Sequence, residues 1–244
     1  DVDEVLCCYY TCFWKYLEMR GIGPLNDDYV FREAHDPYSP LRLQFAEEGG
    51  LENLEAVPGA EAALECLRAA GVRLEVVTCR PSLMRESTEI LLGRLYPPGI
   101  FADMHFVGAG EKGLKCQAIG ASALVDDQIP NIVDATNAGV LGLLLDVDGR
   151  YPWSQCEEGY LPDGALRFTS WNAVCAALFA SLPLVLPTSS SGGLLLQQND
   201  PQPTWLSAEF WVASKDGDSS KPMFGISGVS LDRRKPDNEN CCVS

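Results

Sequence analysis

The stretch KGLKCQAIGASALVDD, residues 112–127, places a helix, a turn and a strand in immediate succession. Residues 111–119 have a helical pattern that stops at Gly120, and glycine is common directly after the end of a helix. The apolar run 123–125 then reads as a short buried strand, and it leads directly into the acidic pair Asp126-Asp127. The stretch is therefore one unit of an alternating helix and strand pattern.

The same alternation continues on both sides of this unit. We predict further helices over residues 58–71, 81–95, 130–138 and 171–180, and further strands over 72–77, 104–107 and 140–145. Short loops between alternating strands and helices are typical of an α/β fold with a doubly wound, parallel sheet. In such sheets, ligands bind beyond the carboxyl ends of the strands.

The two ends of the chain differ from this alternating region. Residues 7–20 are rich in aromatic side chains and predict a helix, which either packs in the core or lines a pocket for a planar group. The turn-rich residues that follow predict short helices, so we expect a helical cap inserted over about 8–57 of a core spanning 1–183. The Ser- and Pro-rich residues 184–244 predict a linker and a largely disordered tail.

Composition limits the classes of partner that the protein can have. A net charge of −16 over 244 residues argues against binding a nucleic-acid polymer, which requires a basic surface. An acidic protein that handles an anionic substrate needs a local cation, so we expect a metal ion. The ten cysteines show no disulfide or zinc spacing, which favours reduced thiols and a cytoplasmic location. No apolar run is long enough to span a bilayer.

Polar residues with catalytic chemistry lie at several predicted strand ends. Thr78 and the Asp126-Asp127 pair follow predicted strands directly. The triplet Asp1-Val2-Asp3 opens the chain, where no strand precedes it, so we expect an N-terminally truncated or processed fragment. If a strand does belong before it, these carboxylates lie at the same edge of the sheet.

In this order and spacing, the residues resemble the haloacid dehalogenase-like hydrolases, specifically the phosphatases of that superfamily. The resemblance covers roughly residues 1–155 and rests on Asp1-Val2-Asp3-Glu4-Val5, Thr78, Lys112 or Lys115, and Asp126-Asp127. It implies a Rossmann-like core with a small C1-type cap and magnesium-dependent hydrolysis of a small phosphorylated substrate. The tract 112–127 and the later run 151–153 also resemble a branch near the 5'(3')-deoxyribonucleotidases, which implies a nucleotide as one candidate substrate.

The resemblance assigns a role to each carboxylate. Asp1 would attack phosphorus and form an aspartyl-phosphate, and Asp3 would act as general acid and then as general base. Mg²⁺ would be held by the Asp1 carboxylate, the Asp3 carbonyl oxygen, and either Asp126 or Asp127. The interpretation without a function is that these residues cap turns and helix starts.

The remaining site residues would bind the phosphoryl group. Thr78 would donate its hydroxyl to that group, with the helix that we expect from Pro81 directed at the same point. Lys112, whose spacing to the acidic pair fits better than that of Lys115, would neutralise the transition state. Arg80 would be a second phosphate contact or a surface residue.

Several alternatives remain open at this stage. Asp146-Val147-Asp148 repeats the D-V-D triplet after a better strand, although a strand-ending turn with Gly149 is the favoured interpretation. His35 and His105 are expected to be structural. The fold could also serve a catalytically idle binding or scaffold protein, or a phosphomutase; Asp3 argues against a dehalogenase.

The chain ends in Cys241-Cys242-Val243-Ser244, which matches a C-a-a-X box. This match predicts prenylation of Cys241 and a lipid-anchored membrane association. The alternative is an exposed pair of thiols.

Overall fold

The computed structural model describes residues 1–36, 38–155 and 161–181. It is an α/β fold in which the strands β1 to β5 of the described residues pair in parallel, as the alternating pattern predicts. The predicted linker and tail, with the C-a-a-X cysteine Cys241, lie outside the described residues. No helix in the described ranges is long and apolar enough to cross a membrane.

The strands form two parallel groups. β1 (Val76–Thr78) pairs with β2 (Met104–Phe106), and β4 (Leu141–Leu145) pairs on one side with β3 (Ala123–Asp126) and on the other with β5 (Ala165–Phe168). The expected strand over 72–77 is therefore wrong at its start, because only its last two residues belong to β1. Since the strands of each group run in parallel, their carboxyl ends meet at one edge.

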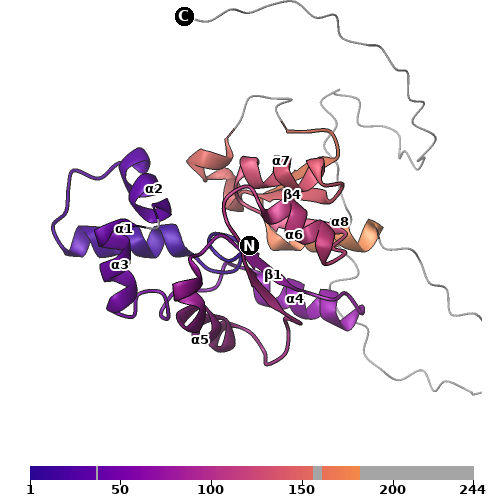
Figure 1. Ribbon diagram of the computed structural model, residues 1–244, viewed down its shortest axis with the longest axis horizontal. Helices are drawn as coiled ribbons and strands as arrows, with labels where there is room; N and C mark the ends of the chain where they lie inside the picture. The colour runs from indigo at the N-terminus through magenta and orange to yellow at the C-terminus, as the bar shows by residue number, and fades with distance from the viewer. Residues whose placement is uncertain (37, 156–160, 182–244) are drawn as a thin grey trace, which may run out of the picture. The chain divides into compact units, whose positions relative to one another are not determined.

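Helices connect the strands and cover them (Figure 1). α4 (Ala60–Ala69) precedes β1, α5 (Arg85–Leu95) joins β1 to β2, and α6 (Lys112–Ala118) joins β2 to β3. α7 (Ile129–Asn137) joins β3 to β4, and α8 (Trp171–Ser181) follows β5. These helices lie close to their predicted positions, because each has an apolar face at helical spacing.

One helix start differs from its prediction. Pro81 does not begin a helix but precedes a 3-10 turn over Ser82–Met84, and α5 begins only at Arg85. The ring of Pro81 fixes its φ at −54° and its ψ is extended at 141°, so the chain turns before it becomes helical. The expected helix terminus at Pro81 is therefore wrong by several residues.

Three short helices fill the region where a helical insertion is expected. They are α1 (Tyr9–Met19), α2 (Asp27–His35) and α3 (Pro40–Glu47), and Figure 1 shows them gathered beside one another, apart from the strands. The side chain of Asn26 accepts a hydrogen bond from the backbone of α2, and Ser39 does the same for α3. The boundary of a cap at 8–57 stays a prediction.

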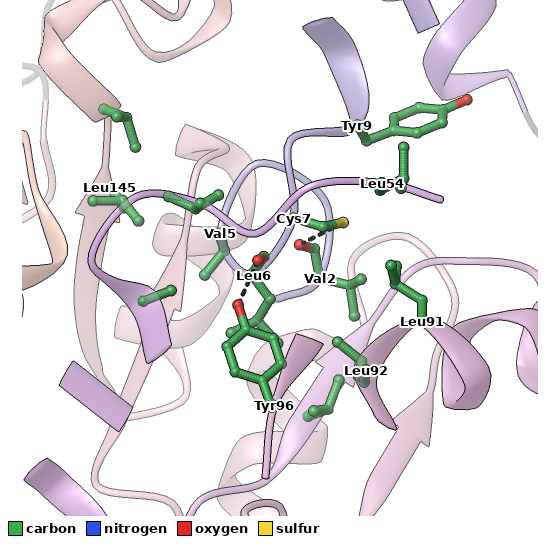
Figure 2. Packing of buried hydrophobic residues seen from close by; sticks show 14 of the residues in the cluster. Val2, Val5, Leu6, Cys7, Tyr9, Leu54, Leu91, Leu92, Tyr96 and Leu145 are labelled. Carbon is green, nitrogen blue, oxygen red and sulfur yellow. Dashed lines mark hydrogen bonds between the residues drawn. The ribbon is translucent and has the colours of Figure 1, made fainter. Parts of the chain in front are cut away.

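The hydrophobic core joins these helices to the strands. Val2 and Leu6 are buried in it, and the Tyr96 hydroxyl donates a hydrogen bond to the Leu6 carbonyl oxygen at 2.5 Å (Figure 2). The aromatic side chains Tyr9, Phe13 and Tyr16 of α1 are buried against Phe45 of α3. These three rings pack in the core, so they do not line a pocket for a planar group.

A cavity of about 510 Å³ lies between β1 and β3. Apolar side chains, including Val77, Leu124 and Trp171, form much of its wall, and Asp1 is the only predicted site residue that lines it. The N-terminal amino group of Asp1 donates a hydrogen bond to the carbonyl oxygen of Val125 in β3 at 2.9 Å. The candidate active site lies elsewhere, around the carboxyl ends of the strands.

Candidate active site

The acidic pair lies at the carboxyl end of β3. Asp126 is the last residue of that strand, and both Asp126 and Asp127 are fully buried. Oδ1 of Asp126 accepts hydrogen bonds from the Gln128 backbone nitrogen at 3.0 Å and from Asn131 Nδ2 at 2.9 Å. Asp126 therefore contacts the start of α7, although the N-cap residue of that helix is Gln128.

Lys112 connects the acidic pair to Asp1. It is the first residue of α6 and is fully buried. Its Nζ lies 2.6 Å from Oδ2 of Asp126 and 2.8 Å from Oδ1 of Asp1. Lys115 is one turn further along α6 and is partly exposed. Of the two lysines, Lys112 is therefore the one that contacts Asp1 and Asp126.

Asp1, Asp126 and Asp127, here called the carboxylate cluster, could hold a metal ion. One oxygen from each lies within 4.8 Å of the others. Oδ1 of Asp127 is buried and has no hydrogen-bond partner among the described residues. An unpartnered buried carboxylate oxygen is costly unless a cation or proton satisfies it, and hard oxygen ligands suit Mg²⁺. The residues present therefore fit the expected magnesium ion.

The two carboxyl groups of the acidic pair, Asp126 and Asp127, have different pKa shifts. Burial, followed by the charge of Asp126, raises the pKa of Asp127 well above its usual range. Burial also acts on Asp126, but the adjacent Lys112 ammonium outweighs it and lowers the pKa of that carboxyl. The pKa values of the two neighbouring carboxyls are therefore shifted in opposite directions.

Asp3 pairs with Arg80. The side chain of Arg80 is fully buried, and its Nη2 donates to Oδ1 of Asp3 at 2.5 Å, while Nε lies 3.1 Å from Oδ2. Nη1 donates to the Thr88 hydroxyl at 3.0 Å, which fixes the guanidinium. Burial alone would raise the pKa of Asp3, but the Arg80 charge and hydrogen bonds outweigh it and lower that pKa.

This pairing changes the interpretation of Arg80. The sequence predicts a phosphate contact or a surface residue, but the guanidinium is buried and already bound to a carboxylate. Thr78, the last residue of β1, is also buried, and its Oγ1 accepts a hydrogen bond from the Arg80 backbone nitrogen at 3.2 Å. Thr78 therefore shapes the loop that carries Arg80, and its place as a phosphate ligand stays a prediction.

The second D-V-D triplet is a structural turn. Asp146 is fully buried, and its carboxylate accepts from the Tyr151 backbone nitrogen at 2.8 Å and from Gln155 at 2.9 Å. Asp148 is exposed, pairs with Arg150, and has a φ of 56°, in the left-handed region. The favoured interpretation of this triplet as a strand-ending turn is therefore correct.

The two histidines have structural partners. His105 Nε2 lies 2.7 Å from a carboxylate oxygen of Glu75, and His35 Nδ1 lies 2.8 Å from the carbonyl oxygen of Phe31. All the described cysteines are free thiols, as their spacing predicts.

The structure adds residues that the motifs do not identify. Trp153 Nε1 donates to Oδ2 of Asp127 at 2.6 Å, and the Ser154 hydroxyl donates to the Asp127 carbonyl oxygen. Glu4 is buried beside the triplet, and burial raises its pKa to about 7. The run Tyr151-Pro152-Trp153 stands out in the sequence. The sequence does not indicate that Trp153 contacts Asp127.

Comparisons with known proteins agree on the architecture. No family model matches the chain, and no curated protein sequence matches it. Among solved structures, a hydrolase of the haloacid dehalogenase family from Deinococcus radiodurans R1, with bound phosphate and sodium, is 20% identical with a TM-score of 0.51. The alignment covers 74% of this chain and 93% of that one.

Two further structures are similar. A haloacid dehalogenase-like hydrolase from Streptococcus pneumoniae has a TM-score of 0.51 at 12% identity, with 73% of this chain and 95% of that chain covered. A protein from Thermotoga maritima, provisionally called a β-phosphoglucomutase, has a TM-score of 0.52 at 20% identity, with 75% and 97% covered. This chain therefore has the fold of the haloacid dehalogenase-like hydrolases.

Proposed function

We propose that the protein is a magnesium-dependent phosphomonoester hydrolase that acts through an aspartyl-phosphate. One observation carries the proposal: the fold brings Asp1, Lys112 and the Asp126-Asp127 pair together, although they are far apart in sequence. A buried lysine between carboxylates, next to a carboxylate oxygen without a partner, suits a site that binds a cation and a phosphoryl group.

Each residue then has a chemical task. Asp1 would attack phosphorus, so a bond forms between its carboxylate oxygen and phosphorus while the ester bond breaks toward the leaving oxygen. Lys112 would offset negative charge on the phosphoryl oxygens. Asp1, Asp126 and Asp127 would hold Mg²⁺. The ion would act as a Lewis acid and stabilise negative charge on the phosphoryl oxygens.

Asp3 would handle the protons. Its pairing with Arg80 keeps the carboxylate ionised, which is the state that a base needs to deprotonate the attacking water. To act first as an acid toward the leaving oxygen, Asp3 must take up a proton against this pairing. We therefore infer a preference for leaving groups that need little protonation, such as aryl phosphates.

The substrate is proposed to be a small phosphorylated metabolite, with a nucleotide as one candidate. A net charge of −16 supports a small substrate rather than a nucleic-acid polymer. Helices α1 to α3 would form the cap that selects it.

The test is phosphate release from an aryl phosphate with and without Mg²⁺. Asp1→Asn should lower the rate about a thousandfold or more, because it removes the nucleophile. Asp146→Asn is the matched control, since Asp146 is also a buried aspartate in a D-V-D triplet but contacts the 151–155 loop. Activity that survives Asp1→Asn and is lost in Asp146→Asn would refute the proposal.

A further inference from the structure

Five aromatic side chains connect the N-terminal helices to the loop after β4. This aromatic cluster consists of Tyr10, Phe31, His35, Tyr151 and Trp153. Trp153 is at its centre: its ring stacks on Phe31 of α2 at 5.0 Å and on Tyr151 at 5.1 Å. Tyr10 of α1 packs edge-on against it at 4.8 Å. The indole of Trp153 is therefore held by rings from two of the three N-terminal helices.

The same indole is bonded to the carboxylate cluster. Nε1 of Trp153 donates to Oδ2 of Asp127 at 2.6 Å, and the next residue, Ser154, donates to the carbonyl oxygen of Asp127. Because Trp153 occupies Oδ2, the carboxylate presents Oδ1, which is buried and without a hydrogen-bond partner in the described part of the chain. A rotation of the carboxylate would break the bond to the indole.

Asp126 shows the contrast. Oδ1 of Asp126 accepts from Gln128 and Asn131, and Oδ2 accepts from Lys112, so both oxygens already have protein partners. Asp127 alone of this pair offers a buried oxygen that the fold leaves for a ligand. The orientation of Asp127 therefore matters most for a cation in the cluster.

We propose that Trp153 is a positioning residue that fixes Asp127 for metal binding, and that Tyr10 and Phe31 fix Trp153 in turn. This inference rests on the metal site of the proposed function but not on phosphoryl transfer. Groups that orient a metal ligand through a hydrogen bond commonly change metal affinity 10- to 100-fold when they are removed. The placement of α1 and α2 is thereby connected to the affinity of the site for its cation.

The experiment measures the dissociation constant of Mg²⁺ by calorimetry on the full chain without substrate. Trp153→Phe keeps a ring for the stack but removes the N–H, so the constant should rise about tenfold or more. Trp14→Phe is the matched control: the half-buried Trp14 also donates its indole N–H to a carboxylate, Glu18, at 2.9 Å, and phenylalanine keeps a ring beside Tyr10. The Mg²⁺ dissociation constant of the Trp14→Phe variant should equal that of the wild type.

A second variant tests the aromatic connection. Phe31→Leu leaves the indole N–H in place but removes its stacking partner, so metal binding should weaken about threefold or more, less than for Trp153→Phe. If Trp153→Phe does not fold, the Phe31→Leu variant alone tests whether the position of Trp153 affects metal binding. The unfolding temperature without metal identifies a general loss of structure, which would lower that temperature as well.

The outcomes separate the two proposals. A Trp153→Phe variant that is folded and binds Mg²⁺ within twofold of the wild type overturns this inference, and phosphate release by the wild type then still supports the proposed function. Metal binding that depends on Trp153, in a protein that releases no phosphate from any ester, supports this inference and refutes the proposed function. An unchanged Phe31→Leu variant overturns the connection to α2.

Discussion

At the scale of single residues, Glu4 is a buried carboxyl group in a strained conformation. Its side chain is 3% exposed and its φ of 57° lies in the left-handed region, which non-glycine residues seldom adopt. Oε1 accepts a hydrogen bond from the Tyr10 backbone nitrogen at 2.5 Å, at the start of α1. Burial raises its pKa from 4.5 to about 7.

This pKa predicts how stability depends on pH. An acid that is weaker in the folded state binds its proton more tightly there, so the free energy of unfolding falls as pH rises from about 4.5 to about 7. A shift of this size corresponds to about 3 kcal/mol. Glu4→Gln should keep the acceptor for Tyr10 and lose this dependence, becoming more stable than the wild type above pH 7. Urea unfolding of both proteins at pH 5 and 8, with a chelator, measures how the free energy of unfolding changes with pH. An equal change in the wild type and in Glu4→Gln would contradict the prediction.

The candidate site could be predicted only in part. Asp1, Lys112 and the Asp126-Asp127 pair follow from residue type, order and position at strand ends, and the fold does bring them together. The bonds of Arg80 to Asp3 and of Trp153 to Asp127 join residues 77 and 26 positions apart. Such pairings depend on tertiary packing, which local sequence patterns do not contain.

At the scale of elements, the helices were easier to predict than the strands. The segment 72–77 is rich in valine but also contains Arg73 and Glu75. A strand also needs a partner, and pairing with β2 begins only at Val76. β5 (Ala165–Phe168) was not predicted at all, because it is short, contains Arg167 and has no clear alternation. Its parallel pairing with β4 is a tertiary contact.

Gly113 of α6 allows a close approach of two helices near the site. A Cβ atom at this position would lie 2.2 Å from the carbonyl oxygen of Asp134 in α7, and the backbone nitrogen of Gly113 donates to Oδ2 of Asp134 at 2.6 Å. Gly113→Ala should therefore lower the free energy of unfolding by about 1–3 kcal/mol, because backbone must move. It should also slow the phosphate release that we propose for this protein, since Lys112 is the adjacent residue.

A matched substitution in another helix checks this prediction. Gly93 of α5 is exposed, and a Cβ atom there would meet nothing within 4 Å. Gly93→Ala should raise the free energy of unfolding by up to about 1 kcal/mol, because alanine favours a helix. Urea unfolding of both variants shows whether the free energy of unfolding falls for Gly113→Ala and rises for Gly93→Ala. Equal effects of the two substitutions would mean that α6 and α7 can separate without cost.

At the scale of the whole molecule, the net negative charge affects how the stability of the fold depends on dissolved ions. The chain has a net charge of −16, and three of its acidic groups, the carboxylate cluster, lie near one buried lysine. Any salt screens the general repulsion, but a divalent cation bound in the carboxylate cluster would also satisfy the unpartnered oxygen of Asp127. The two effects can therefore be separated by comparing salts at equal ionic strength.

Mg²⁺ should raise the unfolding temperature more than NaCl at matched ionic strength. A ligand that binds only the folded state at a hundred times its dissociation constant adds about 2.7 kcal/mol of stability. Since the raised pKa of Asp127 means that Mg²⁺ competes with a proton for this carboxylate, the stabilisation should increase as pH rises. Asp127→Asn should abolish the excess over NaCl and its pH dependence, because an amide carries no proton for the cation to displace. An excess that persists in Asp127→Asn would place the cation elsewhere on this acidic surface.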